Sequence, residues 1–246
     1  MYLNVQGLVL RVSPYNETDA MLTVITRDHG LLSLKARGLR RKNSPLIAPC
    51  QLLAYTDFVL FENRGFYTIN EANLIEIFNG LRKDLLKLSL GTYFAQVTEV
   101  ISQEDIPNPE LLSTLLNCLY ILSVRDVLLS LVKAVFELRV ACIAGYTPDL
   151  SECPCGSGSA ELFDVSEGCV VCSKCAGYRE KGIRMPVSAG VLEAMRYISM
   201  CDSKRLFSFK VGDTAADELS QVTEVYLATQ LERGFSTLDF YKTLLI

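Results

Sequence analysis

The sequence predicts an α+β protein in which a five-stranded barrel is followed by an α-helical domain with an inserted cysteine module. Three observations support this prediction. Short alternating runs fill residues 2–77, helix-spaced apolar residues follow, and five of the nine cysteines crowd between residues 153 and 175. We therefore expect a barrel domain at residues 1–80 and a helical domain at 81–246, with the module at about 150–180.

The barrel is predicted from strand-like runs bounded by turn-forming residues such as Pro14-Tyr15-Asn16. The alternation is clearest in LTVITRD and FYTIN, and no apolar pattern of helix length precedes residue 74. Five strands in about 75 residues without an intervening helix favour the OB-fold barrel over a βαβ sheet. The runs are residues 5–12, 20–28, 30–38, 51–62 and 65–77.

The helical domain is predicted from a change of period near residue 81. Apolar residues then recur at the spacing of one helix face. Pro107 and Pro109 interrupt the pattern, and Gly145 followed by Pro148 ends it before the cysteines. Ser188 is a candidate cap for the first helix beyond them. The expected helices are residues 81–101, 109–123, 125–144, 188–200 and 214–233.

The cysteine module has the spacing of a structural zinc site. Cys153 and Cys155 form one pair, and Cys172 and Cys175 form a second pair about 17 residues later. Thiolates on two short turns suit a closed tetrahedral zinc site. Cys169 offers a fifth sulfur and remains an alternative ligand, because the first pair is CxC instead of CxxC. We expect a structural zinc ion bound by Cys153, Cys155, Cys172 and Cys175.

Composition sets limits on the class of protein. Half of the residues are apolar, the net charge is −4, and no uninterrupted apolar run reaches the roughly 20 residues of a membrane span. The start of the chain does not resemble a signal peptide, so we expect a cytoplasmic protein without a membrane partner. The remaining cysteines lie among apolar neighbours and are expected to be buried small residues: Cys50, Cys118, Cys142 and Cys201.

A basic run follows the third predicted strand and contains no acidic residue. Cations at the edge of an OB barrel can track the phosphates of a single strand, although a solvated loop is an equally good reading of such a run. Nearby aromatic residues could stack on bases, but in strand patterns they more often belong to the core. The cations are Lys35, Arg37, Arg40, Arg41 and Lys42, and the aromatics are Tyr15, Tyr55, Phe58, Phe66 and Tyr67.

Several local motifs, in their order along nearly the whole chain, resemble the bacterial recombination mediator family RecO. No single motif is diagnostic. The motifs are Tyr15-Asn16-Glu17-Thr18-Asp19, His29-Gly30-Leu31, Lys35-Ala36-Arg37-Gly38-Leu39-Arg40-Arg41, Phe136-Glu137-Leu138-Arg139 and Gly145-Tyr146-Thr147-Pro148-Asp149-Leu150.

The resemblance implies an OB domain, a helical domain and a zinc module. It also implies binding of single- and double-stranded DNA, annealing of complementary strands, and loading of RecA together with RecR on strands coated by single-strand-binding protein, whose C-terminal tail is an expected partner. The chain departs from the family's paired CxxC at Glu152, which stands where the first cysteine is expected, so Cys153 serves instead.

The leading functional hypothesis is therefore a mediator of DNA repair that binds DNA electrostatically and has no catalytic residues. Two alternatives come from other classes. The acidic net charge suits an adaptor that binds a protein tail and no DNA. A zinc-dependent hydrolase is disfavoured because the only histidine, His29, lies far from the cysteines and no HxE, HExxH or Walker motif is present.

Overall fold

The computed structural model of the chain describes residues 1–156, 161–178 and 182–245. The chain forms two compact units, one of Met1–Val124 with Phe235–Ile246 and one of Arg125–Gly234. The division expected at residue 80 stays a prediction. In the part of the chain that is described, no helix is both long enough and apolar enough to cross a membrane.

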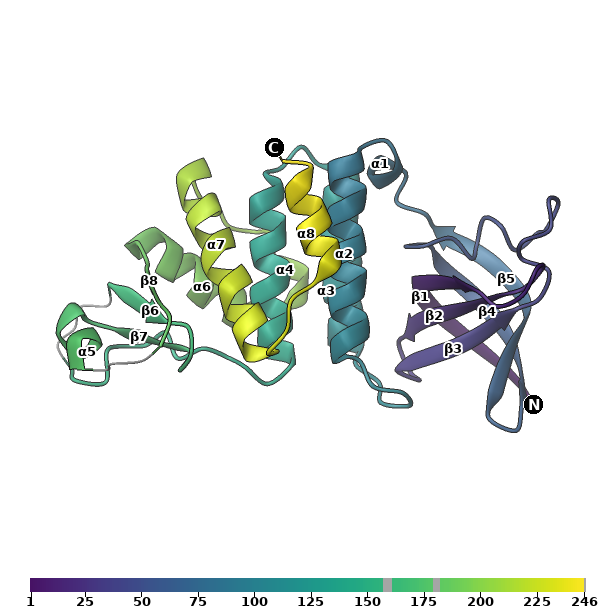
Figure 1. The fold of residues 1–246 in the computed structure, drawn as a ribbon, viewed down its shortest axis with the longest axis horizontal. Helices are drawn as coiled ribbons and strands as arrows, with labels where there is room; N and C mark the ends of the chain where they lie inside the picture. The colour runs from purple at the N-terminus through teal and green to yellow at the C-terminus, as the bar shows by residue number, and fades with distance from the viewer. Residues whose placement is uncertain (157–160, 179–181, 246) are drawn as a thin grey trace. The chain divides into compact units, whose positions relative to one another are not determined.

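The first unit begins with a closed barrel of strand order β1-β2-β3-β5-β4 (Figure 1). Neighbouring strands are antiparallel except β3 and β5, which run parallel. This topology confirms the predicted five-stranded barrel. Its strands are β1 (Tyr2–Pro14), β2 (Ala20–Thr26), β3 (Leu31–Ala36), β4 (Tyr55–Asn63) and β5 (Phe66–Glu76).

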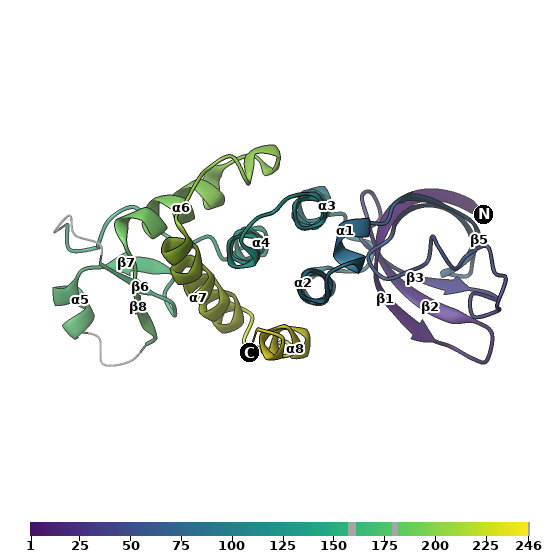
Figure 2. The ribbon, with the colours of Figure 1, turned by 90° about the horizontal axis from the view of Figure 1, so that it is seen from above.

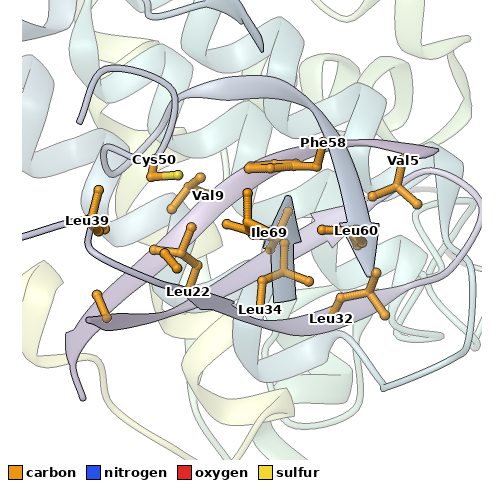
Figure 3. Packing of buried hydrophobic residues seen from close by; sticks show 13 residues of the cluster. Val5, Val9, Leu22, Leu32, Leu34, Leu39, Cys50, Phe58, Leu60 and Ile69 are labelled. Atoms are coloured by element: carbon orange, nitrogen blue, oxygen red, sulfur yellow. The ribbon is translucent and has the colours of Figure 1, made fainter. Parts of the chain in front are cut away.

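The barrel encloses a core of inward-facing residues, because alternate positions of each strand point to opposite faces (Figure 3). In β3, Leu32 and Leu34 are buried, whereas Ser33 between them is exposed. Phe58 and Leu60 of β4 enter the same core. Burying each large apolar side chain stabilises the fold by about 1.5–3 kcal/mol.

Four helices complete the first unit: α1 (Asn79–Arg82), α2 (Leu85–Ile101), α3 (Pro109–Val124) and α8 (Ser236–Thr243). The helix predicted to begin at residue 81 is interrupted at Asp84. The Asp84 carboxylate accepts hydrogen bonds from the N–H groups of Leu86 and Lys87 at 2.9 and 3.2 Å, and so caps α2.

Helix α8 lies beside α2 (Figures 1 and 2), and the sequence patterns did not predict it. The Thr237 hydroxyl and N–H both donate to the side-chain oxygen of Gln96 in α2. Phe235, just before α8, packs edge-on against Tyr93 of α2. The chain therefore returns to its first unit after leaving the second.

The second unit is built on α4 (Leu129–Ile143), which packs against α6 (Ala189–Met200) and α7 (Asp213–Gln230). A 3₁₀ turn at Ser203–Arg205 follows α6. Ser188 precedes α6 as predicted, but its hydroxyl and N–H donate to Glu218 of α7, so it does not cap the helix.

The cysteine module is inserted between α4 and α6, as predicted (Figure 1). Three short antiparallel strands form a sheet of order β7-β6-β8, and a short helix follows β7. The elements are β6 (Leu162–Asp164), β7 (Cys169–Val171), α5 (Ser173–Tyr178) and β8 (Arg184–Pro186).

Candidate nucleic-acid interface and metal centre

The predicted cations lie at the end of β3 and on the loop between β3 and β4, which we call the basic loop (residues 37–54). The side chains of Arg37, Arg40, Arg41 and Lys42 are exposed to solvent. Lys35 differs from them because it is half-buried within β3. Four of the five predicted cations are therefore free of the core and accessible to a large anionic partner.

The loop between β1 and β2 (residues 15–19) holds the basic loop in place through its backbone. The Asp19 carboxylate accepts from the N–H of Gly38 at 2.8 Å, and the N–H of Arg40 donates to the carbonyl of Thr18 at 3.0 Å. The Arg40 guanidinium donates to the carbonyl of Asn16 at 2.6 Å. Two of the motifs quoted from the sequence are thus parts of one contact.

Gly38 allows the basic loop to turn at this contact. Its φ of +67° lies in the left-handed region that residues with a Cβ rarely adopt. The turn is closed by the N–H of Arg41, which donates to the carbonyl of Gly38 at 3.1 Å. The basic run therefore follows a defined path instead of forming an unattached loop.

Lys35, near the end of β3, contacts both Asp19 and Tyr15 of the loop between β1 and β2. The Lys35 ammonium lies 3.5 Å from a carboxylate oxygen of Asp19 and 4.5 Å from the centre of the Tyr15 ring. A cation over a ring face is attracted by the negative face of the π-system. Asp19 therefore neutralises Lys35 in part while it also orders the backbone at Gly38.

A pocket of about 580 Å³ opens on the barrel beside these residues. Its walls come from β2 and β3, from the end of β4 and the start of β5, and from the loops at residues 15–19 and 102–108. Its aromatic lining residues are Tyr15, Phe61, Phe66 and Tyr67, its cations are Lys35, Arg37 and Arg64, and its acids are Glu104 and Asp105.

The aromatic residues singled out in the sequence divide into two groups. Phe58 is fully buried in the barrel core, and Tyr55 and Tyr67 are half-buried. Tyr15 and Phe66 are instead 60% and 79% exposed, and both line the pocket. Alternation alone could not separate these groups, because Tyr15 lies in a loop and Phe66 begins a strand after a turn.

The four predicted ligand cysteines converge in the second unit. Their sulfurs all lie within 4.8 Å of one another, with 3.4 Å between Cys155 and Cys153 and 3.6 Å between Cys155 and Cys172. A tetrahedral zinc with sulfurs at about 2.3 Å holds them about 3.8 Å apart. The donor set therefore has the chemistry and the spacing of a closed metal site.

Cys169 is not part of this set. It lies in β7, where it pairs with Asp164 of β6, and its side chain packs against the apolar side of the cluster. Cys172 and Cys175 flank the start of α5, and the N–H of Cys175 donates to the sulfur of Cys172 at 3.5 Å. An amide that donates to a thiolate stabilises its negative charge.

The side chain of Arg184 joins the helix of the module to its sheet. Asp164 of β6 is buried and lies 3.2 Å from the guanidinium of Arg184 in β8. The same guanidinium donates to the carbonyl of Ala176 in α5 at 3.0 Å. Because α5 carries Cys175, this contact positions a ligand as well as the sheet.

Two of the four scattered cysteines are buried as expected, and two are half-buried. Cys50 and Cys118 are fully enclosed, and burial raises the pKa of the Cys50 thiol to about 12 and that of Cys118 further. Cys142 and Cys201 are partly accessible. Thiols with raised pKa values stay protonated and are poor nucleophiles.

Comparison with known proteins agrees with the fold. The family model described as "Recombination protein O N terminal" matches residues 1–78, and "Recombination protein O C terminal" matches residues 82–239. The chain belongs to the RecO family. Among similar proteins, the DNA repair protein RecO of Acetivibrio thermocellus is 35% identical over 246 residues, which cover 99% of this chain and 97% of the relative.

Further RecO proteins match at lower identity. The DNA repair protein RecO of Alkaliphilus metalliredigens is 31% identical, with 98% of this chain and 99% of the relative covered. That of Bacillus subtilis is 27% identical, with coverages of 92% and 88%. The family resemblance drawn from the order of the sequence motifs is confirmed.

In this RecO-family chain, sequence reasoning missed a charged cluster inside the second unit. The Lys133 ammonium of α4 lies 3.0 Å from Glu137 and 2.8 Å from Glu224 of α7, and it donates to the carbonyl of Ser220 at 3.1 Å. Thr223 donates to Glu137 at 2.8 Å. The signal was present in the four-residue spacing of Lys133 and Glu137 within an apolar helix.

Proposed function

We propose that this chain is a DNA repair protein of homologous recombination that binds single- and double-stranded DNA and anneals complementary strands. With RecR, it helps to load RecA onto single strands coated by single-strand-binding protein. Membership of the RecO family supports this proposal. RecR and the C-terminal tail of the single-strand-binding protein are its expected protein partners.

The observation that carries the proposal is the ordered display of cations on the barrel. Arg37, Arg40 and Arg41 are exposed on a loop whose path is fixed by Asp19 and Gly38. Cations that replace condensed counterions on phosphates gain affinity through the release of those counterions. Ordering the loop before binding reduces the entropy lost when DNA is bound.

The same exposed cations would also promote annealing, which needs no covalent bond to be made or broken. Two complementary strands repel each other through their phosphates, and a protein that neutralises both lowers this repulsion. The net charge of −4 does not oppose this action, because a local cationic loop determines the contact. We therefore assign the chain no catalytic residue.

The four-cysteine cluster is proposed to hold structural zinc. All four ligands are thiols, which leaves no open coordination position of the kind that a catalytic zinc uses for water. The zinc would join the turn at Cys153 and Cys155 to the start of α5 at Cys172 and Cys175. Metal binding free energy in such a module contributes directly to its folding free energy.

Charge reversal of the basic loop tests the proposal. The triple variant Arg37→Glu, Arg40→Glu and Arg41→Glu should weaken binding to single-stranded and duplex DNA and should slow annealing. The plot of log affinity against log salt concentration has a negative slope. Its magnitude should decrease by about three, one for each lost phosphate contact. Fluorescence anisotropy across a salt titration measures the affinity and the slope, and the rate at which two labelled complementary strands form a duplex measures annealing.

The matched control reverses three exposed lysines outside the basic loop, Lys83, Lys204 and Lys210, and so changes the net charge equally. The control should keep most of the affinity of the wild-type chain. If the basic-loop variant binds and anneals DNA as well as the wild-type chain does, the proposed role of the loop is wrong.

A further inference from the structure

The aromatic pocket on the barrel lies beside two strands that pair only briefly. Strands β3 and β5 pair at two positions, Leu34 with Tyr67 and Lys35 with Thr68. The pocket is lined by residues from both strands and has a volume of about 580 Å³. This volume lies within the range of about 300–1,000 Å³ typical of small-ligand sites.

A tight turn presents the most exposed aromatic ring of the pocket. Phe66 follows the turn from β4 to β5, where Arg64 and Gly65 have φ values of +52° and +79°. Two successive residues with positive φ are typical of the type I′ turn, whose twist matches that of the flanking strands. Asn63 pairs with Phe66 across this turn. Phe66 is therefore held at the surface while it is 79% exposed.

Two more rings line the same pocket from other segments. Tyr15 comes from the loop between β1 and β2 and is 60% exposed, and Phe61 comes from β4 and is 42% exposed. Single exposed aromatic residues are common on protein surfaces, but several that gather around one pocket form a continuous apolar patch. Such a patch indicates a binding surface. The flat faces of the rings suit a planar ligand.

The positive and negative side chains of the pocket come from different segments of the chain. Lys35 and Arg37 come from β3 and its end, and Arg64 comes from the turn before β5. Glu104 and Asp105 come from the loop between α2 and α3. The backbone of Glu104 pairs with that of Gly30 in an isolated β-bridge. Phosphates would be attracted by the cations and repelled by the two carboxylates.

We propose that this pocket takes an unpaired nucleobase of single-stranded DNA, which stacks on Phe66 and contacts Tyr15 while its flanking phosphates contact Lys35, Arg37 and Arg64. This inference rests on the proposed function and adds the part of the strand that is recognised. The carboxylates of Glu104 and Asp105 accept from amino groups on the edge of the base and exclude the phosphates from that side of the pocket.

The pocket would thereby distinguish single strands from duplexes. Bases in a duplex are stacked on their neighbours and paired, so their faces cannot reach Phe66 without being unstacked. The basic loop binds phosphates, which both forms of DNA share. The pocket would add affinity only for strands that offer free bases, as stacking platforms do in other single-strand-binding proteins.

The test compares three probes with the full chain: a mixed-sequence single strand, the same strand with abasic sites at its centre, and the duplex. Phe66→Ala and Tyr15→Ala should each weaken binding of the intact strand about tenfold, the size of one lost base-stacking contact. Both variants should bind the abasic strand and the duplex as the wild-type chain does. Phe66→Tyr keeps a ring and should keep the affinity.

Phe240→Ala is the matched control, because Phe240 is 52% exposed on α8 and does not line the pocket. A strand carrying 2-aminopurine gives a second readout. The chain has no tryptophan, so the fluorescence of this base is observed without interference. Transfer of this base from its neighbours onto Phe66 should change its fluorescence when the strand binds the wild-type chain or Phe240→Ala, and should change it much less with Phe66→Ala.

The outcomes separate this inference from the proposed function. If Phe66→Ala and Tyr15→Ala bind all three probes unchanged, or weaken all three equally, the nucleobase pocket is refuted. If charge reversal of the basic loop then still abolishes binding, the proposed function stands without the pocket. If the wild-type chain binds none of the probes, the proposed function fails, and the inference fails with it.

Discussion

The carboxylate of Asp19 accepts a hydrogen bond from the N–H of Gly38 at 2.8 Å, across nineteen positions of the chain. The same carboxylate accepts from the side chains of Asn16 and Thr18, both at 3.1 Å, and lies 3.5 Å from the Lys35 ammonium. These contacts favour the charged carboxylate, foremost the bond from Gly38, and lower the pKa of Asp19 from 3.8 to about 2.

Substitution Asp19→Asn should release the basic loop. The amide keeps the shape of the carboxylate but loses the charge that attracts Lys35 and strengthens the bond from Gly38. We expect weaker binding of single-stranded DNA and faster hydrogen exchange at residues 37–41. Glu17→Gln, an exposed carboxylate of the same β1–β2 loop, is the control and should change neither measurement.

If Asp19→Asn bound DNA as tightly as the wild-type chain while exchange at residues 37–41 increased, the loop would be ordered by Asp19 without any consequence for DNA binding. The two measurements together therefore separate the structural role of Asp19 from its proposed role in preparing the loop for phosphates.

The stability that Asp19 contributes should depend on pH with a definite sign. Because its pKa is lowered from 3.8 to about 2 in the folded protein, the contribution is present above pH 3.8 and is lost as pH falls toward 2. The difference in thermal unfolding between wild type and Asp19→Asn should therefore shrink over this range. A difference that stays constant down to pH 2 would contradict the assignment.

The basic run and the motif at residues 15–19 were both visible in the sequence, but their contact was not. Nothing in the spacing of Asp19 and Gly38 indicates that they meet, since the contact follows from the pairing of β2 with β3. The barrel itself was predictable, because alternating burial leaves its mark on every strand. The pocket was not, because its lining residues come from segments far apart in the sequence.

The helical part shows the same division between local and distant causes. The long buried helices were predicted from their apolar period, whereas α8 was missed because only Leu238 and Tyr241 of its eight residues are buried. The break before α2 had a local signal in Asp84, which is a favoured N-cap residue. Ser188 had the same signal but uses its hydroxyl on Glu218, a residue thirty positions away.

The zinc proposal predicts different outcomes when two cysteines of the module are each replaced by serine. Cys153→Ser should lower the zinc content of the purified protein and increase protease cleavage between Gly145 and Ser188, because it removes a ligand from the cluster. Cys169→Ser should retain the metal, since Cys169 lies in β7 outside the four-sulfur set. Metal analysis and limited proteolysis measure the two effects.

Chelation of the wild-type protein should reproduce the effect of Cys153→Ser on proteolysis. If chelation left the cleavage pattern unchanged, the metal would not be needed for the fold of the module. If Cys169→Ser lost zinc and Cys153→Ser kept it, the ligand set would have to be revised to include Cys169.

The buried ion cluster of Lys133, Glu137 and Glu224 should contribute to the stability of the second unit. Glu137 is fully buried, and Lys133 is nearly so, with both oxygens of Glu137 at 3.0 and 3.1 Å from the ammonium. Lys133→Met would leave the Glu137 carboxylate buried without its cation. Removing one partner of a buried pair costs about 3–5 kcal/mol, so this variant should unfold at a clearly lower urea concentration.

The double variant Lys133→Met and Glu137→Met should recover most of this loss, because it removes the buried charge altogether. Glu224 is less buried than Glu137 and can turn its carboxylate to water. Hydrogen exchange in α4 and α7 should locate the effect, with Lys210→Met, at an exposed position, as the control. A double variant as unstable as Lys133→Met would mean that Glu137 stabilises the unit chiefly through Thr223, whose hydroxyl donates to it at 2.8 Å, and not through the ion pair.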